Sequence, residues 1–330
     1  MAKEILSKFT EDEEHLYEMP ESWAAVLRDR TYQSESPSSI RSFIACPLKW
    51  WLERYSPAPE AEPRYPLTVG TFIHRIPEVF YSEPAEERTE ALFMRVFRDA
   101  WDDITQRAST GIIPRDLQAE FDYLVENAKN PDAFRGMFFK KARTCVENLQ
   151  DMDGDPSEVK VVSNETWCRT EMNGITIRGK IDRIELDKFG REVIQDYKTG
   201  KSPEVPEAED GSVDYFDDGL VAMIMYAYMR AEEIGGGQIS DLASLGALEL
   251  MYLANNEIIR IRITEDLIED ARHLMDQVTR EMREVKETGK IRITGADTPY
   301  QKQCEYCPAQ AICPLWRDGT FDMLQEEVQI

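Results

Sequence analysis

The sequence has no apolar run long enough to cross a bilayer. Its longest, Gly219 to Met229, is well short of the roughly 20 residues that a membrane-spanning helix needs. The acidic N-terminus lacks the basic and apolar regions of a signal peptide. Basic residues are also scarce, with 39 Lys and Arg against 63 Asp and Glu and a net charge of -24. These deficits predict a cytoplasmic protein that does not bind membranes or adhere broadly to a polyanion.

A chain of 330 residues with 42% hydrophobic residues can form one large domain or two smaller ones with buried cores. Its hydrophobic periodicity is helical from about residue 70 to 150 and becomes strand-like near Val159. The patterns divide the chain into an acidic arm, a helical block, a core of strands and helices, and a cysteine-bearing tail. These segments are residues 1–37, 38–157, 158–290 and 291–330.

Three strands follow one another in the core segment. Residues 159–172 and 175–186 flank an Asn-Gly tight turn, and residues 192–198 follow a second turn that contains glycine. This spacing predicts an antiparallel meander. The rest of the segment predicts an acidic loop with seven acids and no base, an apolar helix, two more strands and a long amphipathic helix. They span residues 204–218, 219–233, 245–253, 257–263 and 264–288.

Acidic and basic side chains meet on the second and third of these strands. Asp196 and Lys198 are two residues apart, so they project from the same face of a strand. On the preceding strand the apolar residues change parity at Asp182-Arg183, which predicts a β-bulge that turns Asp182 toward Asp196. The pattern therefore brings two carboxylates and an ammonium group together.

Two carboxylates and a lysine are the groups that metal-assisted phosphodiester hydrolysis requires. The carboxylates offer hard oxygen ligands for Mg²⁺ or Mn²⁺, and the lysine can position water or stabilise the transition state. The alternative is a cross-strand salt bridge on a solvated strand. The D-x-K pattern alone favours that alternative.

The cysteines suggest a second metal site. Cys304, Cys307 and Cys313 form a C-x2-C-x5-C motif, and Cys46 is the best candidate for a fourth ligand. Four thiolates suit either zinc or an iron-sulfur cluster, and their spacing does not choose between them. The remaining cysteines, Cys145 and Cys168, are expected to be buried thiols.

The run GKIDRIELDKFGREVIQDYKTGK resembles the core of the RecB/AddB-like branch of the PD-(D/E)XK nuclease superfamily. The resemblance implies an α/β (α+β) fold with a restriction-endonuclease-like core, in which helices flank a mixed central sheet. It also implies that Asp182 and Asp196 bind Mg²⁺ or Mn²⁺, helped by the main-chain carbonyl of Tyr197. Asp182, Asp196 and Lys198 would be the catalytic residues.

Other family elements are matched less fully. Gly70 and His74 fit a Gly-x-x-x-His signature whose histidine is a further metal ligand, although Pro77 follows three residues later. The glutamine of a Gln-x-x-x-Tyr element is missing, which leaves Tyr226 as a candidate for DNA contact. Glu165 aligns with a frequent family glutamate. The segment 178–201 carries a net charge of +2, and its basic residues Arg183 and Lys201 are further substrate-binding candidates.

The cysteine pattern also has a family counterpart. Iron-sulfur members of the branch, including the small CRISPR-associated nucleases, hold a 4Fe-4S cluster with one N-terminal cysteine and a C-terminal C-x2-C-x5-C motif. The resemblance implies the same ligand set here, made of Cys46, Cys304, Cys307 and Cys313. Such a clasp would join the two ends of the chain as a structural staple.

The resemblance implies a metal-dependent deoxyribonuclease, an exonuclease acting on single-stranded DNA or frayed ends. Recombination, repair or phage DNA processing would be its setting, in a bacterial cell or a phage-infected host, with a helicase or recombination protein as partner. The sequence contains no G-x-x-x-x-G-K-[ST] loop, so we expect no ATP-driven helicase in this chain. The alternative is a non-catalytic module that binds DNA ends or protein and keeps only the iron-sulfur or zinc clasp.

Overall fold

The fold is described from a computed structural model. It describes residues 16–19, 21–22, 25, 34–55, 62–106, 110–204, 218–235, 242–292, 304, 307 and 309–313. Most of the predicted acidic arm, most of the acidic loop and most of the tail lie outside these residues. Within the described part of the chain, no helix is long and apolar enough to span a membrane.

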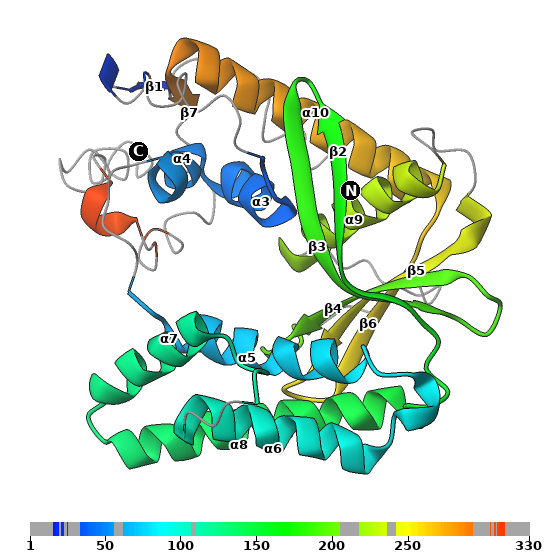
Figure 1. Cartoon of the computed structure of the whole chain (residues 1–330). Helices are drawn as coiled ribbons and strands as arrows, with labels where there is room; N and C mark the ends of the chain where they lie inside the picture. The colour runs from blue at the N-terminus through cyan, green and yellow to red at the C-terminus, as the bar shows by residue number, and fades with distance from the viewer. Residues whose placement is uncertain are drawn as a thin grey trace.

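A mixed five-stranded sheet lies at the centre, as predicted (Figure 1). The strand order is β2-β3-β4-β5-β6, in which β4 and β5 are parallel and the other neighbours are antiparallel. The predicted meander is therefore confirmed as β2, β3 and β4. The strands are β2 (Val161–Met172), β3 (Ile175–Leu186), β4 (Glu192–Lys198), β5 (Leu245–Tyr252) and β6 (Glu257–Arg262). A separate pair joins β1 (Leu16–Glu18) to β7 (Lys290–Arg292).

The predicted change of face on β3 is present, because Ile181 and Ile184 pack into the same core although they are three residues apart. The predicted bulge at Asp182-Arg183 is wrong in position. The pairing of β3 with β4 has no shift, and the irregularity lies on β2, between Val161 and Ser163. The extra residue therefore belongs to the neighbouring strand, which the side-chain pattern of β3 alone did not reveal.

One hydrophobic core lies between the sheet and four helices. Trp50 and Trp51 are fully buried in it, together with Ile194 and Leu250 of the sheet. Its helices are α3 (Pro37–Ala45), α4 (Pro47–Tyr55), α9 (Asp218–Ile234) and α10 (Glu265–Thr288). The helix α10 begins at a Thr264 cap and ends at Gly289, whose φ of 72° lies in the left-handed region that favours glycine.

A second core lies within a block of four further helices, drawn below the sheet in Figure 1. Met251 of β5 belongs to this core whereas Leu250 belongs to the first, so the two cores contact opposite faces of the sheet. The predicted 38–157 segment is thus divided between two cores, since α3 and α4 belong to the first. The block consists of α5 (Tyr65–Phe80), α6 (Glu90–Gln106), α7 (Arg115–Glu126) and α8 (Pro131–Asp153). Short 3-10 turns are η3 (Ala85–Glu87), η4 (Leu242–Ser244) and η5 (Gln310–Ile312).

Candidate metal centre

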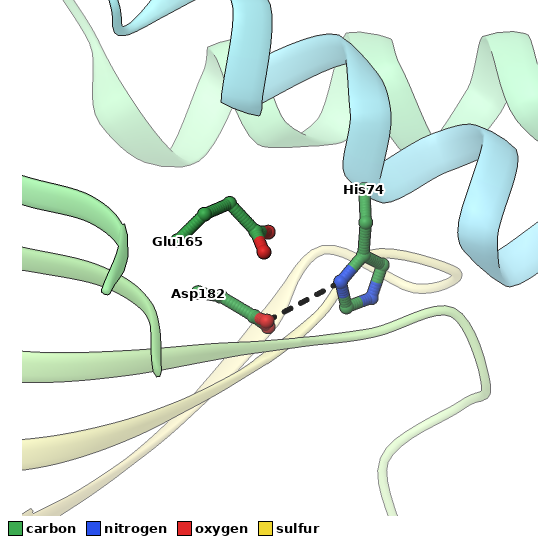
Figure 2. Close-up of side chains that lie close together, drawn as sticks. All are labelled: His74, Glu165 and Asp182. Atoms are coloured by element: carbon green, nitrogen blue, oxygen red, sulfur yellow. Dashed lines mark ion pairs between the residues drawn. The ribbon is translucent and has the colours of Figure 1, made fainter. Parts of the chain in front are cut away.

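Three side chains from different elements converge beside the sheet. His74 comes from α5, Glu165 from β2 and Asp182 from β3, and one ligand atom of each lies within 4.8 Å of the others. Figure 2 shows the imidazole of His74 facing the Asp182 carboxylate, with Glu165 on the same side of the strands. The structure thus brings together two of the predicted metal ligands and adds a glutamate whose role the sequence left open.

The β2-β3 pairing explains why the two carboxylates face each other. Asn164 pairs with Arg183 and Thr166 pairs with Ile181, so Glu165 lies opposite Asp182. Glu165 has a φ of 53°, in the left-handed region that a residue with a side chain rarely adopts. Such a conformation costs about 1–3 kcal/mol and persists only where the surroundings enforce it, as they do at many functional sites.

Two sets of contacts position His74. The side-chain amide of Asn164 donates to the carbonyls of Pro77 (3.3 Å) and Glu78 (2.7 Å), which fixes the end of α5 against β2. The helix continues through Pro77, so His74 remains on a regular helical turn. Its Nε2 donates to the carbonyl of Tyr197 at 2.9 Å, and its Nδ1 is 3.4 Å from Asp182 Oδ1.

Asp196 and Lys198 complete the site from β4. Lys198 Nζ is 2.6 Å from Asp196 Oδ2, so the predicted same-face pair is present as an ion pair. Between them, the Tyr197 N–H donates to Asp182 Oδ2 at 2.7 Å, while the Tyr197 carbonyl accepts from His74. Asp196 lies outside the compact group of three, but its charge raises the pKa of His74, and the charge of Asp182 raises the pKa of Asp196.

The pKa values show an excess of buried negative charge. Burial raises the pKa of Asp196 and of Glu165, and the nearby charge of Asp182 raises both further. Burial alone would lower the pKa of His74, but the charges of Asp182, Asp196 and Glu165 raise it to about 9. The pKa of Asp182 is lowered, because His74, the Tyr197 N–H and Lys198 together outweigh its burial.

This arrangement fits a divalent cation. Carboxylate and carbonyl oxygens suit Mg²⁺ and Mn²⁺, and the imidazole is an additional ligand that manganese accepts more readily than magnesium. The raised pKa values of Glu165 and Asp196 mean that the buried acids resist ionisation together, which a bound cation would relieve. The residues present therefore match the donor set of a divalent-cation site.

The structure places Arg183, a predicted substrate-binding residue, in a buried ion pair. Its side chain is fully buried and donates two hydrogen bonds to the carboxylate of Asp153, at 2.9 and 2.5 Å. Its guanidinium also lies over the rings of Tyr81 and Tyr197, at 4.5 and 5.7 Å from their centres. Arg183 therefore stabilises the face of the sheet that contacts the second core.

The two other substrate-binding candidates have different surroundings. Lys201 is exposed beyond the end of β4. Tyr226 is half-buried against β3, where a Cβ added to Gly179 would lie 2.5 Å from its Cε1 atom. Gly179 is thus required for the close approach of α9 to β3, which places Tyr226 near enough to Asp182 and Asp196 for their charges to raise its pKa further, beyond the effect of burial.

The cysteines of the two chain ends converge near α4. Cys46, Cys307 and Cys313 pack against the first core. Burial raises the pKa of the Cys304 thiol to about 11, and the charges of the other three thiols add to this effect. Among the residues that the structure describes, however, no three sulfur atoms lie within 4.8 Å of one another. Cys145 and Cys168 are buried, as predicted.

Comparisons with known proteins identify the family. The sequence pattern of the PD-(D/E)XK nuclease superfamily matches residues 34–314, and the chain belongs to this superfamily. The comparison with curated proteins found no match. Among solved structures, the chain is similar to a "Putative exonuclease" from Eubacterium rectale, with 14% identity, coverage of 85% of this chain and 92% of that chain, and a TM-score of 0.41. It is also similar to the protein SSO0001, with 15% identity, coverage of 81% and 93%, and a TM-score of 0.29.

Proposed function

We propose that the protein is a metal-dependent deoxyribonuclease of the RecB/AddB-like type that hydrolyses phosphodiester bonds in single-stranded DNA or at DNA ends. The observation that carries this proposal is the convergence of His74, Glu165 and Asp182, next to the Asp196–Lys198 ion pair, in a member of a nuclease superfamily. The protein's net charge of -24 opposes sliding along duplex DNA. We therefore expect a helicase or recombination protein in the cytoplasm to deliver the single-stranded DNA.

Each residue of the site has a defined role in this proposal. His74, Glu165 and Asp182, with Asp196 and the Tyr197 carbonyl, would hold Mg²⁺ or Mn²⁺. When bound, the cation supplies an activated water molecule and offsets charge on the phosphate. Lys198 remains protonated because Asp196 raises its pKa against the effect of burial. Its ammonium group would donate to a phosphate oxygen in the transition state.

A nuclease assay tests the proposal. Single-stranded oligonucleotides, blocked at the 5′ or the 3′ end, are incubated with Mg²⁺, Mn²⁺ or EDTA. We expect cleavage only with metal, and Asp182→Asn and Glu165→Gln to reduce its rate by more than about 100-fold, because outer-sphere partners of metal ligands already contribute 10- to 100-fold. Glu269→Gln is the matched control, since Glu269 pairs with Arg272 on the exposed surface of α10.

The outcomes separate the candidates. Cleavage that is equal in Glu165→Gln and the unchanged protein would refute the assignment of Glu165. Binding of DNA ends without metal-dependent hydrolysis would replace the nuclease with the non-catalytic alternative. Protection by one end block and not the other would establish exonuclease polarity, whereas cleavage of both blocked strands would show endonuclease activity.

We further propose that Cys46, Cys304, Cys307 and Cys313 hold a 4Fe-4S cluster that joins the two ends of the chain. Beyond the effect of burial, the other three thiols raise the pKa of Cys304, and Cys307 and Cys313 raise that of Cys46, which supports their proximity. Four thiolates suit either a 4Fe-4S cluster or tetrahedral zinc, so metal analysis decides between them.

Metal analysis tests the cluster. We expect iron, acid-labile sulfide and absorbance at about 400 nm in protein purified without oxygen. Cys307→Ser should lose the iron and be unstable, whereas Cys145→Ala, which alters a buried thiol of the second core, should retain it. Stoichiometric zinc in colourless protein would refute the cluster, and normal melting of Cys307→Ser would refute its role as a staple.

A further inference from the structure

An exposed tryptophan lies on the same strand as the metal centre. Trp167 follows Glu165 by two residues on β2, and its side chain is 62% exposed. The guanidinium of Arg178, on β3, lies 5.5 Å from the centre of the indole ring. The neighbouring residues Cys168 and Thr170 are buried on the opposite side of the hairpin. Trp167 is therefore not part of either core, and its ring is available at the surface.

Basic side chains surround this ring. Lys180 is the register partner of Trp167 and makes an ion pair with Glu165, with Nζ 2.5 Å from Oε2. Arg169 is the register partner of Arg178, and both are exposed. Within the described residues, neither arginine forms an ion pair with a carboxylate. In a chain with a net charge of -24, this is a local excess of positive charge.

The geometry connects these residues to the metal centre. Side chains two residues apart on a strand share a face and are separated by about 7 Å. Lys180, the register partner of Trp167, links the ring to Glu165 through its ion pair, and Arg169 lies one such step beyond Trp167, toward the end of the hairpin. That end is anchored, because the Asn173 amide donates to the Asp276 carbonyl (2.9 Å) and to Thr279 Oγ1 (3.0 Å) of α10. The end of the β2-β3 hairpin is therefore held in place by α10.

We propose that Trp167, Arg169, Arg178 and Lys180, here called the hairpin strip, bind the single-stranded DNA that enters the metal centre. An exposed indole can stack on any base, but base faces are accessible only when the strand is unpaired. The arginines would contact the phosphates on either side of the stacked base. This inference rests on the proposed nuclease function and identifies the part of the surface that selects single strands.

Direct binding tests the strip without turnover. Fluorescence anisotropy of a labelled oligothymidine is measured in EDTA at several salt concentrations. Trp167→Ala should raise Kd by about 5- to 150-fold, the effect of losing one base-aromatic stack, and Trp167→Phe should restore much of the affinity. Arg178→Gln should reduce the slope of log K against log salt by about 0.7, the value for one phosphate contact on a single strand.

Phe189 provides the matched control. It is 70% exposed at the β3-β4 turn and lies against Lys188 and Arg191, at 5.1 and 5.0 Å, so it has the same chemical setting away from the strip. Phe189→Ala should leave Kd unchanged. A blunt duplex of the same length should bind weakly, and Trp167→Ala should change its Kd by less than twofold.

The outcomes distinguish the strip from the nuclease proposal. Unchanged oligothymidine affinity in both Trp167→Ala and Arg178→Gln would overturn the strip, even if the protein cleaves DNA. An equal loss of duplex and single-strand affinity in Trp167→Ala would overturn the stacking role. Loss of single-strand affinity in Trp167→Ala, together with no metal-dependent cleavage by the unchanged protein, would support the strip and refute the nuclease.

Discussion

Replacing Arg183 tests whether this residue is structural. Arg183→Met removes a buried guanidinium and leaves the Asp153 carboxylate, 5% exposed, without its main countercharge. It also leaves the Gln195 side-chain oxygen without the Arg183 Nε–H that donates to it at 2.5 Å. Removing one partner of a buried ion pair lowers the free energy of unfolding by about 3–5 kcal/mol. With an unfolding entropy of about 2.1 cal/mol/K per residue, this loss lowers Tm by about 4–7 °C if the two cores unfold together.

The assay is thermal and urea unfolding, combined with the oligonucleotide binding measurement. Arg183→Lys should recover only part of the stability, because an ammonium group cannot make the two parallel bonds to Asp153. Adding Asp153→Asn to Arg183→Met should also recover part of the loss, since it removes the unpaired charge but keeps an acceptor for the Tyr81 hydroxyl, which bonds to Asp153 at 2.5 Å. A loss of stability below about 1 kcal/mol, with weaker DNA binding, would refute the structural role.

Three further substitutions test local packing and a buried carboxyl group. Gly179→Ala should destabilise the protein by about 1–3 kcal/mol in urea unfolding, because its Cβ would overlap Tyr226. Gly136→Ala on α8, where a Cβ meets no atom within 4 Å, should instead stabilise it by about 0.5–1 kcal/mol, and equal effects at both positions would contradict this packing. Burial raises the pKa of Glu185 from 4.5 to about 6, so the folded protein loses stability as pH rises through this range. Above pH 6, the free energy of unfolding of Glu185→Gln should therefore exceed that of the unchanged protein by up to about 2 kcal/mol, and near pH 4 the two should be equal. A constant difference between the two proteins at all pH values would contradict this expectation.

Much of the fold followed from local patterns in the sequence. The alternation of apolar residues and the Asn-Gly turn predicted the β2-β3-β4 meander, because strand faces and tight turns depend on neighbouring residues. The caps of α10 at Thr264 and Gly289 could be predicted for the same reason. The same-face placement of Asp196 and Lys198 also follows from the period of two on a strand.

The register in which the strands pair with one another could not be predicted from local patterns. A bulge on β2 and the left-handed backbone of Glu165 place this glutamate opposite Asp182, whereas the pattern of β3 alone put the bulge at Asp182-Arg183. Likewise, Arg183 belongs to a positively charged segment of the sequence, but its burial depends on Asp153 at the end of a separate helix. Register and burial are properties of two segments together.

The sequence by itself determined the five strands of the central sheet, the caps of α10 and the chemical groups of the candidate metal site, because each depends on residue types a few positions apart. Only the tertiary structure decided which acids share that site, since His74, Glu165 and Asp182 are brought together by three elements from different parts of the chain. It also decided that Arg183 is buried and that Trp167 is exposed beside the candidate metal centre. Long-range packing sets these outcomes, because it determines which face of each element meets solvent, a core or another charge.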